Sequence, residues 1–167
     1  MTLEKRCFIG LGSNLGNPPQ QIRDACAALG AIPALTGLSG SPLYTSKPMG
    51  PPDQPDYVNA VVACCTLLEA EALLDVLQSI EQAQGRERTG PRWGARTLDL
   101  DLLTYGDSQI DSPRLRVPHP GIAERAFVLL PWADIAPGFL IPGLGRVGEL
   151  ARRFPAGAVS RLDERAN

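Results

Sequence analysis

The chain has 167 residues, a length that favours a single folded domain. Its 16 basic and 18 acidic residues leave a formal charge of −2, which argues against a general binder of nucleic acid or of anionic membranes. The N-terminus MTLEKRCFIG lacks the apolar core of a signal peptide, no run has the length of a membrane-spanning helix, and the four cysteines lack the spacing of a zinc site. We therefore expect a cytoplasmic protein whose cysteines are reduced.

The first half of the chain predicts alternating strands and helices. A short apolar run, CFIGLGS, indicates a buried strand that begins at Arg6. Residues 17–30 carry apolar side chains at helical spacing, with Pro19 in the first turn and Gly30 just after the last one. We expect a second strand over residues 35–44, followed by a stiff proline-rich loop, SKPMGPPDQPD.

The second half continues this pattern. Residues 57–68 are β-branched and mostly apolar, as in a central strand covered on both faces. Residues 69–85 predict an amphipathic helix ended by Gly85, and residues 97–105 predict a strand with one apolar and one acidic face. Beyond them we expect a short helix (127–136), a hairpin (138–145), one or two helical turns (146–153) and a weakly patterned, fraying tail after Phe154.

This element order, β-α-β-β-α-β, predicts an α+β protein with a ferredoxin-like sandwich and C-terminal additions. The sandwich hosts many functions, so an enzyme, a small-ligand sensor and an RNA-binding module are all compatible with it. RNA-binding versions expose aromatic side chains on their central strands, whereas the corresponding strands here carry glycines and aspartates.

Two carboxylates mark the acidic strand. Asp99 and Asp101 are two residues apart, so strand alternation places them on one face, with Cα atoms about 6.6 Å apart. Carboxylates at this spacing can flank a pair of divalent ions. The alternative is an edge strand whose solvent-facing side happens to carry two acids.

An arginine-rich segment precedes this strand. Residues 86–96 contain four arginines and one glutamate in a loop that also holds Trp93. A polyphosphate with Mg²⁺ would satisfy a basic loop next to an acidic strand, because the metal neutralises the phosphates and the aspartates hold the metal. A solvated loop of mixed charge is the alternative.

Other nucleotide-binding signatures are weak or absent. In the run GLGSNLG the third glycine, Gly16, comes one residue late for a dinucleotide fingerprint, and the downstream acidic residue is missing, so a tight turn with a helix cap is favoured. No P-loop motif occurs. His119 is the only histidine and cannot belong to a multi-histidine metal site.

Read together, four segments resemble the 6-hydroxymethyl-7,8-dihydropterin pyrophosphokinase family of folate biosynthesis. They are GLGSNLGNP, GPPDQPDYVNAVV, GRERTGPRWGARTLDLDLLTYG and RVPHPGIAERAFVLLPWADIAP, and they cover roughly residues 6–138. The resemblance implies transfer of a pyrophosphoryl group from ATP to the hydroxymethyl oxygen of a reduced pterin, with release of AMP. It also implies two Mg²⁺ ions, small-molecule substrates and no obligatory protein partner.

Site residues follow from the matched motifs. The resemblance implies that Asp99 and Asp101 bind the metal ions and act in catalysis together with Arg86 and Arg96. It places the nucleotide at Gln78, Glu81, Arg88, Arg92, Trp93, Leu102, Arg114, His119 and Arg125. It places the pterin between Tyr57 and Phe127, with Ser46, Pro48 and Asn59 at the edge of the ring.

Three positions depart from the family pattern. Thr89 stands where relatives can carry Lys, Arg116 where a small hydroxyl residue can occur, and Pro120 where an aromatic can occur. None of them is a metal ligand or a pterin-stacking residue. Ordinary γ-phosphoryl transfer, with ADP as the product, remains an alternative that residue spacing alone does not exclude.

Overall fold

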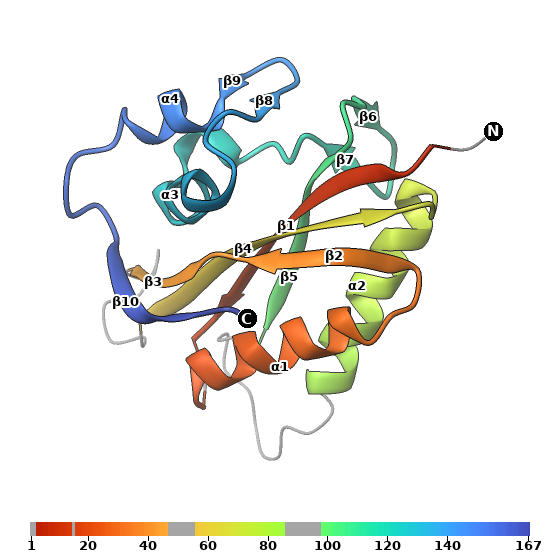
Figure 1. Cartoon of the computed structure of the whole chain (residues 1–167), viewed down its shortest axis with the longest axis horizontal. Coiled ribbons are helices and arrows are strands. Elements are labelled where there is room, and N and C mark those ends of the chain that lie inside the picture. Colours follow the sequence, from red (N-terminus) through yellow and green to blue (C-terminus); the bar gives the residue numbers. More distant parts are fainter. Residues whose placement is uncertain (1–2, 15, 47–55, 86–97) are drawn as a thin grey trace.

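The computed structural model describes residues 3–14, 16–46, 56–85 and 98–167 (Figure 1). Most of the predicted proline-rich loop and all of the arginine-rich loop lie outside the described residues. Within the described ranges, no helix is both long enough and apolar enough to cross a membrane.

A six-stranded antiparallel sheet forms the centre of the fold. β1 lies between β4 and β5 and is buried from its third residue onward, which explains its nearly continuous apolar sequence. The strand order is β10-β3-β4-β1-β5, and β2 also pairs with β4. The bounds are β1 (Lys5–Ser13), β2 (Leu35–Gly40), β3 (Pro42–Ser46), β4 (Tyr57–Thr66), β5 (Asp99–Tyr105) and β10 (Ser160–Arg165).

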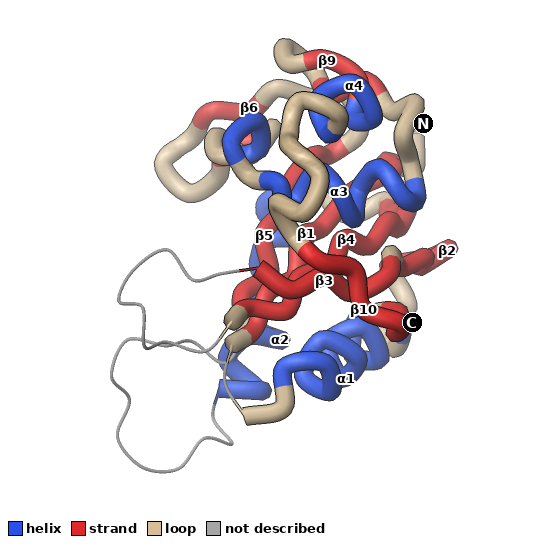
Figure 2. Tube along the Cα trace, turned by 90° about the vertical axis from the view of Figure 1, so that its left-hand side faces the viewer, coloured by secondary structure: helices blue, strands red, loops and turns tan. Residues whose placement is uncertain are grey.

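Two long helices, α1 (Pro18–Gly30) and α2 (Ala70–Gly85), cover one face of the sheet (Figure 1, Figure 2). α1 begins where the Asn17 side chain accepts a hydrogen bond from the backbone N–H of Gln20. The apolar stripes of both helices pack into one core with the sheet, and their fully buried members include Ile22, Leu29, Leu73 and Leu77.

A second core fills part of the opposite face, beneath α3 (Ala126–Ile135) and α4 (Val147–Ala151) (Figure 2). The ring centroid of Phe8, on β1, lies 5.0 Å from the ring centroid of Trp132 and 4.8 Å from that of Phe139. Short elements connect this layer to the sheet: β6 (Ile110–Asp111), β7 (Arg116–Val117), η1 (Ile122–Glu124), β8 (Leu140–Ile141) and β9 (Gly145–Arg146).

The structure confirms the predicted α+β class. When β2 and β3 are counted as one interrupted strand, the first 105 residues have the predicted order β-α-β-β-α-β. The short helix, the hairpin and the last helical turn appear as α3, β8 with β9, and α4.

The predicted single strand over residues 35–44 is wrong, because it is divided at Ser41. There the Ser41 backbone N–H donates to the carbonyl of Val61, while the Ser41 hydroxyl accepts from the Val61 N–H. Upstream, Gly37 adopts a left-handed φ of 63° where the pairing register shifts between Thr36 and Ser39. Both halves pair with the same partner, β4.

Two further expectations, about the end of α1 and about the C-terminal tail, are also wrong. Gly30 is the last residue of α1 and Ala31 caps it, in ordinary right-handed geometry. The tail after Phe154 is not frayed, because β10 pairs with β3 at the edge of the main sheet. Residues of β10 are almost all exposed, so this strand has no apolar alternation that its sequence could reveal.

Candidate functional site

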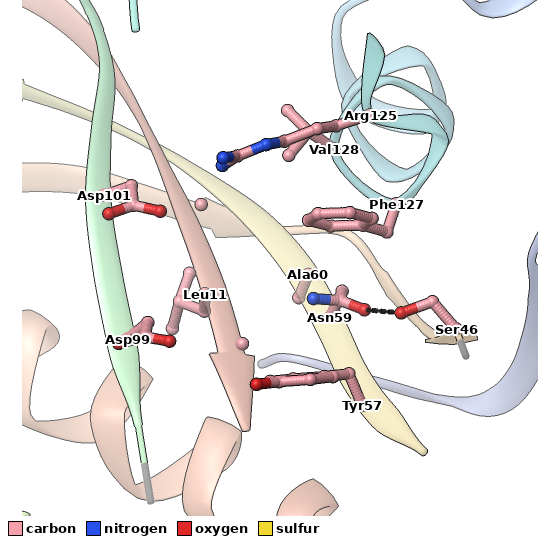
Figure 3. A pocket seen from close by; sticks show the side chains of 12 residues that line it. Leu11, Ser46, Tyr57, Asn59, Ala60, Asp99, Asp101, Arg125, Phe127 and Val128 are labelled. Carbon is pink, nitrogen blue, oxygen red and sulfur yellow. Dashed lines mark hydrogen bonds between the residues drawn. The ribbon is translucent and has the colours of Figure 1, made fainter. Parts of the chain in front are cut away.

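A cavity of about 210 Å³ opens where β1, β4 and β5 meet the start of α3 (Figure 3). It lies on the face of the sheet that α3 covers only in part. Its lining combines two aromatic side chains, one amide, one hydroxyl, two carboxylates and one guanidinium. The lining residues are Gly10, Leu11, Gly12, Ser46, Tyr57, Asn59, Ala60, Asp99, Asp101, Arg125, Phe127 and Val128.

The two aromatic side chains lie on either side of the Asn59 amide (Figure 3). Tyr57 and Asn59 share one face of β4 because they are two residues apart, whereas Phe127 comes from α3. The Ser46 hydroxyl donates a 2.7 Å hydrogen bond to Asn59 Oδ1. This bond fixes the amide orientation and leaves the Nδ2 hydrogens to serve as donors in the cavity.

Two carboxylates, Asp99 and Asp101, point into the cavity from β5 (Figure 3). Between them, the backbone N–H of Leu100 donates a 2.7 Å hydrogen bond to Glu81 on α2, which ties this part of β5 to the helix. Both carboxylates are half-buried.

Glycines on β1 keep the floor beside these carboxylates open. In the β1–β5 register, Gly12 pairs with Asp99 and Gly10 pairs with Asp101. A Cβ at Gly12 would approach Asn59 Nδ2 to 3.0 Å, closer than ordinary van der Waals contact. The predicted tight turn at GLGSNLG is therefore wrong for these two glycines, which lie inside a strand, and the left-handed φ of 64° occurs later, at Gly16.

The donor set suits a hard divalent cation. Asp99 and Asp101 offer carboxylate oxygens, the ligands that Mg²⁺ prefers. Among the described residues, no cluster of three or more metal-binding side chains occurs. Mg²⁺ commonly takes its remaining ligands from water and substrate phosphates.

His119, which lines an adjoining cavity, lies close enough to Asp101 and Arg125 for both charges to affect its pKa. Burial lowers the pKa of His119, the Asp101 carboxylate opposes this effect and the Arg125 guanidinium adds to it. The Nδ1 atom of His119 accepts a hydrogen bond of 3.2 Å from the Gly121 N–H, so a neutral imidazole carries its proton on Nε2. His119 can therefore donate from Nε2, and Arg125 projects toward Asp101 (Figure 3).

A second cavity, of about 280 Å³, adjoins the first and shares Asp101 with it. Leu102, Arg114 and His119, all predicted to be near the nucleotide, line it together with Arg116. Its full lining is Leu74, Leu100, Asp101, Leu102, Ser112, Pro113, Arg114, Leu115, Arg116, His119 and Pro120.

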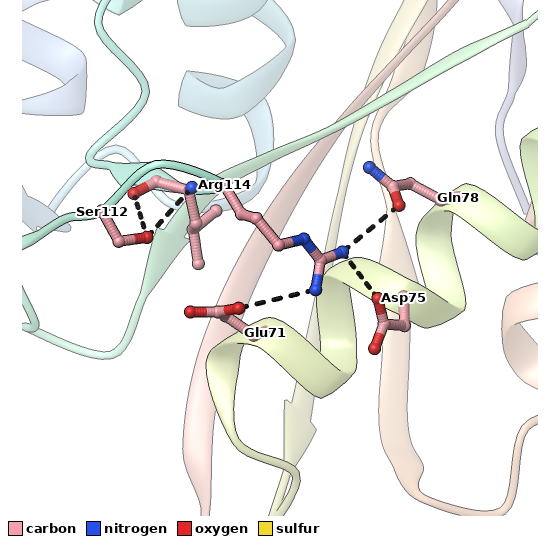
Figure 4. Close-up of polar contacts among 6 residues, drawn as sticks. Glu71, Asp75, Gln78, Ser112 and Arg114 are labelled. Carbon is pink, nitrogen blue, oxygen red and sulfur yellow. Dashed lines mark hydrogen bonds and ion pairs between the residues drawn. The ribbon is translucent and has the colours of Figure 1, made fainter.

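Arg114 is held against α2 by three side chains (Figure 4). Its Nη2 lies 2.6 Å from Asp75 and 3.4 Å from the Gln78 amide oxygen, and its Nη1 lies 3.5 Å from Glu71. The hydrogen bond to Asp75 and its charge raise the pKa of Arg114. The guanidinium is thus tethered beside the second cavity.

The structure brings most of the predicted site residues together. Ser46, Tyr57, Asn59, Asp99, Asp101, Arg125 and Phe127 line the first cavity, and Leu102, Arg114 and His119 line the second. Gln78 and Glu81 line neither, and instead hold Arg114 and the backbone of β5. Pro48, Arg86, Arg88, Arg92, Trp93 and Arg96 lie outside the described residues.

Sequence reasoning missed the small and apolar lining of the first cavity. Gly10 and Gly12 are its most informative members, since each pairs with an aspartate on β5. The signal was present as a Gly-x-Gly strand opposite an Asp-x-Asp strand, but it needs the pairing register. Leu11, Ala60 and Val128 carried no such signal.

Comparison with known proteins gives a consistent family match. The family model of 7,8-dihydro-6-hydroxymethylpterin-pyrophosphokinase (HPPK) matches residues 8–137. Proteins named 2-amino-4-hydroxy-6-hydroxymethyldihydropteridine pyrophosphokinase are similar to this chain. The one from Pseudomonas aeruginosa is 47% identical, covering 95% of this chain and 97% of its own length. The one from Haemophilus influenzae is 45% identical, covering 88% and 91%.

Solved structures show the same fold. A Plasmodium falciparum HPPK-DHPS variant crystallised with STZ-DHP superimposes with a TM-score of 0.70 at 14% identity, over 91% of this chain. The match spans 46% of that longer chain. A second Plasmodium falciparum HPPK-DHPS structure, with SDX-DHP, gives a TM-score of 0.71 at 13% identity, over 99% of this chain and 49% of the other.

Proposed function

The chain belongs to the 7,8-dihydro-6-hydroxymethylpterin-pyrophosphokinase family, and we propose that it transfers a pyrophosphoryl group from ATP to 6-hydroxymethyl-7,8-dihydropterin, a step of folate biosynthesis. The hydroxymethyl oxygen attacks the β-phosphorus and releases its proton to solvent, while the bond from that phosphorus to the α,β-bridging oxygen breaks and its electron pair leaves on AMP. The products are AMP and the pterin pyrophosphate. The observation that carries this proposal is one cavity with a carboxylate pair at one side and two aromatics around an amide at the other.

The aromatic side of the cavity suits a flat heterocycle. Tyr57 and Phe127 stack on the two faces of the pterin ring, which explains their positions on either side of Asn59. The Asn59 amide, oriented by Ser46, pairs with the polar edge of the ring. Gly12 leaves room beside that amide because it has no side chain.

Asp99 and Asp101 are the residues that would hold two Mg²⁺ ions, with the phosphates of ATP as further ligands. Bound there, the ions would neutralise phosphate charge and make the β-phosphorus more electrophilic. The carboxylates fix this charge beside the aromatic walls, so that the attacking oxygen and the phosphorus are held close together.

Cationic and donor groups border the position proposed for the phosphates. Arg125 supplies a guanidinium in the first cavity. In the second cavity, His119 supplies an Nε2–H and Arg114 supplies another guanidinium. These groups stabilise the negative charge that develops on the phosphates as AMP leaves. Arg86 and Arg96 are further proposed phosphate contacts, on the basis of sequence.

The decisive experiment is to incubate the protein with ATP, Mg²⁺ and 6-hydroxymethyl-7,8-dihydropterin and to separate the nucleotides. We expect AMP to accumulate only when the pterin is present, in equal amount to the pyrophosphorylated pterin. Reactions without pterin, and with a chelator in excess over Mg²⁺, are the controls. ADP as the product would move the attack to the γ-phosphorus, and no turnover at all would overturn the proposal.

A further inference from the structure

Gly121 lies in the loop between His119 and the first residue of η1, and it is packed against a side chain of the site. A Cβ built on Gly121 would lie 2.7 Å from Arg125 Nε, 2.8 Å from Cζ and 3.0 Å from Nη2. Ordinary contacts between such atoms are about 3.5–4.0 Å. The Arg125 guanidinium therefore occupies the space that any side chain at position 121 would take.

The backbone at Gly121 does not itself demand glycine. Its φ of −96° and ψ of 5° are open to residues with side chains. Its N–H donates to His119 Nδ1, a bond that an alanine would keep. The three atoms nearest to such a Cβ all belong to Arg125, so the missing side chain makes room for that residue.

Arg125 has a further restraint that defines its direction. Its guanidinium carbon lies 5.8 Å from the centre of the Phe127 ring, a cation–π contact across the first turn of α3. From there the side chain extends toward Asp101 (Figure 3). The guanidinium is thus held over the cavity, with the Phe127 ring and the backbone of Gly121 next to it.

We propose that Gly121 is a positioning residue that sets the place of the Arg125 guanidinium in the site. In catalysis this inference rests on the proposed function, because it assigns Arg125 to the transferring phosphates. A displacement of about 1 Å in such a group can cost a hundredfold in rate, since charge stabilisation depends on fixed geometry.

Gly121→Ala tests the inference. We expect kcat/KM for pterin-dependent AMP formation to fall about tenfold to 100-fold, with the thermal unfolding midpoint nearly unchanged, because Arg125 can move away from the new methyl group. Gly138→Ala is the matched control: position 138 also lacks a left-handed φ, and its Cβ would have no atom within 4 Å. That variant should retain wild-type kinetics.

A double-mutant cycle separates positioning from a general structural role. In an Arg125→Ala background, Gly121→Ala should cause no further loss of kcat/KM, and any stability lost in the single variant should return. An equal loss in both backgrounds, or wild-type kinetics for Gly121→Ala, would overturn the inference. Failure of the proposed function would look different, because the wild-type protein itself would then form no pterin-dependent AMP.

Discussion

At the scale of single residues, the site depends on what faces the carboxylates. Gly10 and Gly12 stand opposite Asp101 and Asp99 on the neighbouring strand, so no β1 side chain competes for the space beside either acid. Two like charges two residues apart on one strand face repel each other in the folded protein. Under the proposed function, a cation bound there would offset this repulsion.

The carboxylate Asp101 provides the first prediction at this scale. Asp101→Asn keeps the shape and the strand alternation but removes a charged oxygen ligand. We expect turnover to fall about 10²–10³-fold, while the free energy of unfolding changes by less than about 1 kcal/mol. Steady-state AMP formation and urea denaturation measure the two quantities.

Asp107→Asn is the matched control for that prediction. Asp107 is exposed in the turn that follows β5, at the opposite end of the strand from the cavity. The same chemical change there should leave turnover as in the wild type. Full activity in Asp101→Asn would remove the carboxylate pair from the proposed mechanism.

At the scale of elements, Asp134 joins α3 to the sheet through polar contacts. The Tyr44 hydroxyl, on β3, donates a 2.5 Å hydrogen bond to Asp134 near the end of α3, and Arg161 of β10 lies 3.6 Å from the same carboxylate oxygen. Burial and this hydrogen bond raise the pKa of Tyr44. The contact joins two elements that both contribute side chains to the cavity, Ser46 from β3 and Phe127 from α3.

Tyr44→Phe removes the hydroxyl and keeps the ring. We expect a loss of about 1–2 kcal/mol in the free energy of unfolding, because the bond joins a buried donor to a charged acceptor. Urea denaturation measures this loss. In an Asp134→Ala background the same substitution should cost much less. An equal cost in both backgrounds would show that Asp134 does not provide the stabilisation.

Elements with a strong apolar pattern were predictable from the sequence, and those without one were not. The central strands and the two long helices bury continuous or periodic apolar residues, so their positions follow from sequence. β10 buries almost nothing and is specified by its pairing with β3. The break at Ser41 likewise depends on a hydrogen bond to a distant strand.

The same distinction holds for the site. Sequence reasoning placed Tyr57, Asn59, Phe127 and the two aspartates in one candidate site because resemblance carries them as local segments, and all five line one cavity. The roles of Gly10, Gly12 and Gly121 were not, because each depends on a neighbour that the fold brings close. Sequence reasoning identified the polar and aromatic side chains of the cavity better than the glycines that leave space around them.

At the scale of the whole molecule, the cysteines make stability depend on alkaline pH. Burial raises the pKa of Cys7 and Cys26 to about 12 and that of Cys64 to about 11, from an ordinary value of 9.0. In the unfolded chain these thiols lose protons above pH 9, whereas in the folded protein they keep them. Stability from this source is therefore complete below pH 9 and falls as pH rises toward 11–12.

Urea denaturation under reducing conditions at pH 7.5, 9 and 10.5 measures this dependence. For each pH unit above its unfolded pKa, each thiol lowers the free energy of unfolding by up to about 1.4 kcal/mol. Cys26→Ala is the internal control, because its stability should fall less steeply with pH than that of the wild type, whatever its stability at pH 7.5. Parallel pH profiles for the two proteins would contradict the assignment.

Asp101 belongs to the walls of both cavities, and this shared wall has a thermodynamic consequence. A ligand that changes the charge around Asp101 from one side alters the electrostatic field that a ligand on the other side experiences. The two binding free energies are then linked. If a ligand in the second cavity changes the affinity of the first cavity for its ligand by some factor, a ligand in the first cavity changes the affinity of the second by the same factor.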